Sequence, residues 1–128
     1  MKDTLKKLAE LQNQRRDIIN QLKVEFNEAL KQVFVDNPKL EQISMYVNNH
    51  EFNDGDATSF YIGWEDMTIS VDGEEIQREW DRNTKAYVEH PLLNNLIELF
   101  GQVQDIHEDM YGDVFENLTI DREEILNN

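Results

Sequence analysis

The sequence predicts an α+β fold, in which a long N-terminal helix precedes a three-stranded antiparallel meander that one or more C-terminal helices cover. Three observations lead to this prediction. Apolar residues recur every three to four positions over roughly the first 35 residues, as they do along one face of a helix. Segments between residues 40 and 71 alternate apolar and polar side chains, as strands do. A second apolar stripe with helical spacing follows Pro91.

The first predicted element is a helix from residue 3 to about residue 35. No glycine or proline interrupts it, and Asp36-Asn37-Pro38 ends it because proline cannot continue the helical hydrogen-bond ladder. At 1.5 Å per residue this helix is roughly 50 Å long. A compact chain of this size has a diameter of roughly 36 Å. We therefore expect the helix to overhang its own domain.

An overhanging helix can pair with a second subunit or bend back onto its own domain. Gln12 and Arg15 interrupt the apolar stripe where a strict heptad needs apolar residues, so a long leucine zipper is not predicted. We favour pairing in a homodimer. The predicted pairing face consists of Leu8, Leu11, Ile18, Ile19, Leu22 and Phe26. The chain would then comprise a long amphipathic helix over residues 1–37, with a possible role in oligomerisation, and an acidic α+β domain over residues 38–128.

Three strands are predicted after the helix, over Leu40–Asn48, Thr58–Trp64 and Met67–Val71. We expect Glu65-Asp66 to close a tight hairpin between the second and third strands. Asp72-Gly73 supplies a further turn, because glycine tolerates positive φ. A sheet of this kind has one apolar face and needs a helical cover.

The predicted cover is a helix from Pro91 to about Tyr111, since proline suits the first helical turn. The segment before it, residues 80–89, is compatible with a short helix or with a loop. The tail over residues 114–126 contains Thr119–Glu124, a sequence typical of a capped helical turn.

Composition excludes several classes of protein. The chain has no cysteine, which excludes disulfides, a thiolate nucleophile and cysteine metal sites. No apolar run approaches the roughly 20 residues that span a bilayer, and the N-terminus lacks the apolar core of a signal peptide. We therefore expect a soluble, cytoplasmic protein that does not bind membranes.

No stretch of the sequence specifies a reaction. Asn53-Asp54-Gly55-Asp56 lacks the closing ligands of a calcium loop, so we interpret it as a turn, with a weak cation site and a partner contact as alternatives. His107-Glu108 has Tyr111 where a zinc-protease helix needs its second histidine. Nucleophile elbows and glycine-rich phosphate or dinucleotide loops are absent. We predict no catalytic residue, no metal site and no cofactor.

The strongest signal is charge. The net charge is −15, and residues 1–40 hold eight of the 12 basic and six of the 27 acidic side chains. Residues 41–128, which we call the head, therefore carry a net charge of −17. Such a surface repels nucleic acid and anionic membranes and attracts basic protein surfaces. The alternative is that the charge only keeps the protein soluble.

The acidic residues predicted to contact a basic partner lie throughout the head. On one continuous helix, those from Asp105 to Glu116 would form a single charged face. The predicted contact residues are Asp54, Asp56, Glu65, Asp66, Glu74, Glu75, Asp105, Glu108, Asp109, Asp113 and Glu116.

The stretch MYVNNHEFNDGDATSFYIG resembles a segment of small accessory proteins of tailed bacteriophages, in which an aromatic-rich strand runs into Phe-Asn-Asp-Gly-Asp and then a second strand. The matching positions are Tyr46, Phe52, Asn53, Asp54, Gly55, Asp56 and Phe60. The resemblance implies a phage accessory protein of the infected bacterial cytoplasm and no known reaction. Small acidic phage proteins are often inhibitors of host nucleic-acid-handling or defence machinery.

Two functional hypotheses follow. The first is a non-enzymatic protein that binds a basic host or phage protein through the head, with DNA mimicry as one form of that binding. The second is a structural or assembly protein that acts through its N-terminal helix.

Overall fold

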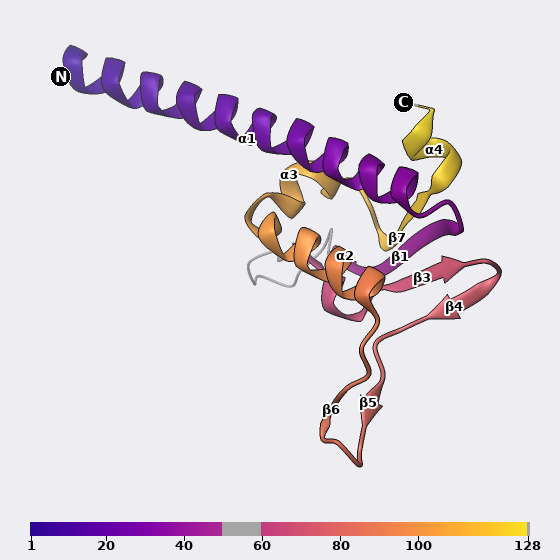
Figure 1. Ribbon diagram of the computed structural model, residues 1–128. Helices are drawn as coiled ribbons and strands as arrows, with labels where there is room; N and C mark the ends of the chain where they lie inside the picture. Colours follow the sequence, from indigo (N-terminus) through magenta and orange to yellow (C-terminus); the bar gives the residue numbers. More distant parts are fainter. Residues whose placement is uncertain (50–59, 128) are drawn as a thin grey trace.

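The computed structural model describes residues 1–49 and 60–127 of the chain (Figure 1). The predicted turn at Asn53–Asp56 and the predicted contact residues Asp54 and Asp56 lie outside the described residues. The helices are α1 (Lys2–Asp36), α2 (Pro91–Gln102), α3 (His107–Tyr111) and α4 (Arg122–Leu126), with short 3-10 turns η1 (Trp64–Asp66) and η2 (Gln104–Ile106). The strands are β1 (Leu40–Asn49), β2 (Phe60–Ile62), β3 (Thr68–Val71), β4 (Glu74–Ile76), β5 (Trp80–Asp81), β6 (Ala86–Tyr87) and β7 (Glu116–Asp121). The predicted α+β class is confirmed.

Helix α1 forms and ends as predicted. At its C-terminus the backbone N–H and the side-chain Nδ2 of Asn37 both donate to the carbonyl of Val33, at 3.0 and 2.8 Å. Figure 1 shows the N-terminal half of α1 extending beyond the rest of the molecule. The helix does not bend back onto its own domain, so that alternative is wrong, whereas pairing with a second copy stays a prediction.

The C-terminal half of α1 packs against the head and contributes side chains to the same hydrophobic core. Phe26, Leu30 and Phe34 are buried, and the ring of Phe26 meets that of Phe100 edge to face at a centroid distance of 5.0 Å. Phe26 is therefore not available to a second helix, which corrects its place in the predicted pairing face. The other members of that face are half-buried, as Ile19 is, or exposed, as are Leu8, Leu11, Ile18 and Leu22.

Strand β1 is the centre of the sheet. One of its edges pairs antiparallel with β7, from Gln42 opposite Asp121 to Val47 opposite Glu116. The other edge pairs first with β3 and then with β2, and both of these run antiparallel to β1. Strands β2 and β3 thus lie one after the other along the same edge, with η1 between them.

The hairpin predicted at Glu65-Asp66 is therefore wrong, and the three predicted strands do not form a meander, because β2 and β3 both pair with β1. These residues lie in η1, where the N–H of Met67 donates to the carbonyl of Trp64 at 3.4 Å. Ile62 and Met67, on either side of the turn, are both fully buried. Their positions differ by an odd number, so an uninterrupted strand would point them to opposite faces. Because the turn η1 interrupts the strand between these two residues, the Met67 side chain also points to the core face.

The turn predicted at Asp72-Gly73 is confirmed, and it joins β3 to β4, a strand that was not predicted. Asp72 and Gly73 both have positive φ, 54° and 83°, as the favoured two-residue hairpin turn requires.

For residues 80–89 the sequence was compatible with a short helix or a loop, and the structure shows neither. These residues contain the β5–β6 hairpin, in which Trp80 and Tyr87 meet edge to face at 5.0 Å and the guanidinium of Arg78 lies 3.7 Å from the Tyr87 ring centroid.

The single helix predicted from Pro91 to Tyr111 is interrupted. Pro91 starts α2 as predicted, with the ring Nδ1 of His90 accepting a hydrogen bond from the N–H of Leu93 at 3.3 Å. After Gln102 the chain tightens into η2 and then enters α3. The carbonyl of Phe100 accepts hydrogen bonds from the N–H of Val103 at 3.3 Å and from the ring of His107 at 2.8 Å. A side chain thus competes for an acceptor of the helical ladder, which favours the break.

The tail also differs from its prediction. Strand β7 runs through Asp121, and α4 begins only at Arg122, so the capped turn predicted over Thr119–Glu124 is wrong in its first half. Leu118 and Ile120 of β7 are buried beside β1. Burial of these two apolar side chains against the central strand outweighs the local preference for a turn.

Candidate binding pocket

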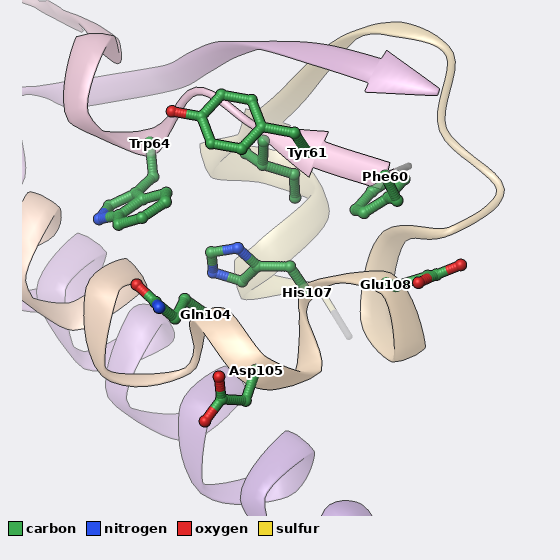
Figure 2. A pocket seen from close by; sticks show the side chains of 8 residues that line it. Phe60, Tyr61, Trp64, Gln104, Asp105, His107 and Glu108 are labelled. Atoms are coloured by element: carbon green, nitrogen blue, oxygen red, sulfur yellow. The ribbon is translucent and has the colours of Figure 1, made fainter. Parts of the chain in front are cut away.

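An open cavity of about 270 Å³ lies where β2 and η1 face η2 and α3. Figure 2 shows its aromatic side chains on one side and the side chains of the η2–α3 segment on the other. It is lined by Phe60, Tyr61, Ile62, Trp64, Gln104, Asp105, His107 and Glu108. We call this the aromatic pocket.

Aromatic rings form one wall of the pocket. Tyr61 and Trp64 have ring centroids 6.1 Å apart and planes tilted by 55°. Gly101 of α2 fixes how closely the helix approaches this wall, because a Cβ at that position would lie 3.1 Å from Nε1 of Trp64. Because Gly101 has no side chain, the indole ring of Trp64 can lie directly against α2.

His107 forms the base of the pocket. Its side chain is 4% exposed, its Nε2–H donates to the carbonyl of Phe100 at 2.8 Å, and its ring meets that of Trp64 edge to face at 5.5 Å. Burial lowers the pKa of His107, while the Phe100 carbonyl and the Asp105 carboxylate act in the opposite direction. The ring is therefore neutral at neutral pH, and its second nitrogen, Nδ1, is a hydrogen-bond acceptor.

The acceptor Nδ1 faces the cavity (Figure 2). Within residues 1–49 and 60–127 this nitrogen has no hydrogen-bond partner. Asp105 from η2 and Glu108 from α3 are exposed and are among the lining residues, and in Figure 2 their side chains point away from the aromatic rings. The pocket thus combines flat aromatic surface, one buried acceptor and two carboxylates, which is the chemistry of a site for a cation that donates hydrogen bonds.

The neutral state of His107 predicts a stability that depends on pH. Because burial lowers its pKa below the ordinary 6.5, the unfolded chain binds a proton more readily than the folded one. This contribution to stability is complete above pH 6.5 and is lost as the pH falls through the lowered pKa. Asp105, Glu108 and Tyr61 are the other titratable groups that line the cavity.

Urea unfolding at pH 7.5 and pH 5.0 checks this prediction. Between pH 7.5 and pH 5.0 we expect His107→Gln to lose less stability than the wild type, because glutamine does not titrate. We expect NMR titration of the His107 ring to give a midpoint below 6.5. A midpoint at or above 6.5 would contradict the prediction.

The predicted contact residues that the structure describes are distributed over several elements. Asp105 and Glu108 line the aromatic pocket, and Glu65 and Asp66 belong to η1, the turn that starts with Trp64. Asp109 lines a different hollow together with Arg15, Arg16 and Lys23 of α1. Of the remaining residues, Glu74 and Glu75 lie on β4, Asp113 lies on the α3–β7 connection, and Glu116 is the first residue of β7.

The single charged helix face predicted from Asp105 to Glu116 is therefore wrong. The helix breaks before Gln104 and α3 ends at Tyr111, so these acidic residues are divided among η2, α3, the α3–β7 connection and β7. Sequence reasoning also missed the pocket residues Tyr61, Trp64 and His107. A usable signal was present, since His107 lies seven residues after Phe100 on the apolar stripe, where a polar ring needs a buried partner.

Other kinds of site are not found in the described part of the chain. No three or more His, Asp or Glu side chains in residues 1–49 and 60–127 are grouped so that they could hold a metal ion. Over the same residues, none of the helices combines the length and apolar character needed to cross a bilayer.

Comparison of the chain with protein-family models, with curated proteins and with solved structures gives no match. The resemblance to phage accessory proteins therefore rests on residues 46–60, most of which lie outside the described residues.

Proposed function

We propose that this is a non-enzymatic accessory protein that binds a basic protein surface through its head. The observation that carries the proposal is the aromatic pocket, because its rings, carboxylates and buried acceptor suit a cationic side chain. The net charge of −17 on residues 41–128 would steer a basic partner toward the pocket and repel nucleic acid. An origin in a tailed bacteriophage, where the partner would be a host or phage protein, is part of this proposal.

Mimicry of DNA is the less favoured form of the proposal. Duplex DNA carries one negative charge per roughly 1.7 Å of its axis, so a mimic needs a continuous row of carboxylates. The predicted contact residues that the structure describes instead lie on η1, β4, the η2–α3 segment, the α3–β7 connection and the start of β7. Local binding of basic side chains, for instance on a nucleic-acid-handling protein, fits this distribution better.

An assembly role for α1 is the second candidate. Leu8, Leu11 and Ile18 are 50%, 59% and 58% exposed on the part of the helix that extends past the head (Figure 1). An apolar stripe at this spacing is typical of helices that pair. The partner in this case would be a second copy of the chain, and the head would be a soluble cap.

Capture from a bacterial lysate with the tagged full-length chain tests both candidates. We expect basic proteins to bind at low salt and to elute between about 0.1 and 1 M salt, because the Debye length then falls from about 10 to about 3 Å. Mass spectrometry identifies the captured proteins.

Leu8→Glu/Leu11→Glu is the discriminating variant, since both positions are exposed and lie outside the core. Binding through the head predicts that this variant captures the same proteins. The assembly role predicts that it loses them and sediments as a monomer. Capture of acidic proteins, or of partners that salt does not release, would contradict binding through the head.

A further inference from the structure

We infer that the aromatic pocket binds one arginine side chain of the basic partner, with the guanidinium against the aromatic wall, an N–H group directed at His107 Nδ1, and the exposed carboxylates of Asp105 and Glu108 attracting its charge from the edge of the cavity. This inference rests on the proposed function and names the group that its site recognises.

The wall of the pocket suits a flat cation. Guanidinium groups stack on aromatic faces, and this attraction is strongest over tryptophan. Tyr61 and Trp64 present two rings at a mutual tilt of 55°, and the volume of about 270 Å³ accommodates a guanidinium with part of its aliphatic stem. A lysine ammonium is compact and strongly hydrated, so it would use the flat wall less well.

The acceptors of the pocket match the donors of the same group. A guanidinium has five N–H donors and no acceptor. Asp105 and Glu108 place charged carboxylates at the edge of the cavity from two successive elements, and His107 offers a neutral acceptor from the base. The His107 tautomer is fixed by its bond to Phe100, so Nδ1 is held ready to accept rather than to donate.

Other classes of ligand fit the pocket less well. An anion would face two carboxylates and the lone pair of His107. An apolar side chain would cover Nδ1 and leave a buried acceptor without a partner, which is unfavourable. The arginine side chain satisfies the aromatic wall, the carboxylates and the buried nitrogen together.

NMR titration of the ¹⁵N-labelled full-length protein with Nα-acetyl-arginine amide tests the inference. We expect saturable shifts of the Trp64 indole N–H and of the His107 Nδ1 resonance, with a dissociation constant on the order of 1 mM for so small a probe. Nα-acetyl-lysine amide should bind more weakly. Nα-acetyl-citrulline amide, which has nearly the same shape without the charge, should show no saturable binding.

A matched pair of double variants separates the pocket from the overall charge. Asp105→Asn/Glu108→Gln removes both pocket carboxylates, and both side chains are exposed, so the fold should persist. We expect it to weaken binding of the arginine probe about tenfold. Glu25→Gln/Glu28→Gln removes two exposed carboxylates of α1 that do not line the pocket, and we expect it to bind the probe within about twofold of the wild type.

The outcomes are distinguishable from those of the proposed function. Equal losses in the two double variants, shifts that avoid Trp64 and His107, or a lysine probe that binds as tightly as the arginine probe would each overturn the arginine site. Each of those results leaves capture of basic proteins by the head intact. Failure to capture any basic protein overturns the proposed function, and the arginine titration then measures the pocket independently.

Discussion

Deletion of residues 1–35 is expected to unfold the head, whereas deletion of residues 1–17 is expected to leave it folded. The longer deletion removes Phe26, Leu30 and Phe34, which are at most 2% exposed. Truncating a buried phenylalanine or leucine to alanine typically costs about 2–5 kcal/mol. The free-energy cost of losing all three side chains is therefore comparable to the roughly 5–15 kcal/mol that stabilises a whole domain. Circular dichroism and a thermal melt measure the effect.

The shorter deletion is the control, because residues 2–17 of α1 are all exposed. We expect it to retain a cooperative melt close to that of the full chain. A cooperative melt of the fragment that begins at residue 36 would show that the core of the head does not need α1. The predicted division after residue 37 cuts through this core, so only the shorter deletion can separate the contribution of the overhanging helix from that of the head.

Local signals explain why α1 could be predicted and why its packing could not. The uninterrupted helical pattern and Pro38 determine where the helix runs, and both are properties of neighbouring residues. Apart from the interruption at Gln12 and Arg15, the apolar stripe runs from Leu5 to Phe34. Which part of it enters the core depends on where the sheet lies, and this is a long-range property that periodicity does not report.

Strand pairing shows the same limit. A hairpin at Glu65-Asp66 and the observed arrangement around η1 both place Ile62 and Ile69 on the core face. Alternation is identical in the two arrangements, so the sequence cannot choose between them. The arrangement is determined by the length of β1. One edge of this strand pairs with β3 and β2 in succession, and its other edge pairs with β7.

The pocket was partly predictable at the level of residue types. Asp105 and Glu108 were expected to contact a basic partner, on the grounds of charge alone. Their usefulness comes from Tyr61 and Trp64, which lie more than 40 residues earlier in the chain and meet them only because the helical cover breaks after Gln102. The distribution of charge in the sequence indicates that the ligand is cationic. Only the fold determines which carboxylates lie beside aromatic rings.

Replacement of Arg122 by methionine is expected to lower the free energy of unfolding by about 2–3 kcal/mol. Nη1 of Arg122 donates to the carbonyls of Phe34, Asn37 and Leu40 at 2.7, 3.3 and 3.3 Å. In a continuing helix the carbonyl of Phe34 would accept from the residue four positions later, which is Pro38 and has no N–H. The guanidinium replaces that missing donor and places a positive charge at the C-terminus of α1, where no basic residue stands in the last turn.

Arg122→Lys separates the charge from the hydrogen bonds. The ammonium keeps the favourable interaction with the helix terminus, but the lysine side chain is shorter and its nitrogen does not reach the position of Nη1, so we expect it to restore only part of the lost stability. The methionine variant should lower the melting temperature on the order of 10 °C, and the lysine variant should lower it less. Equal melting temperatures for the wild type and the methionine variant would mean that water satisfies these carbonyls as well as Arg122 does, and that α4 does not secure the junction between α1 and β1.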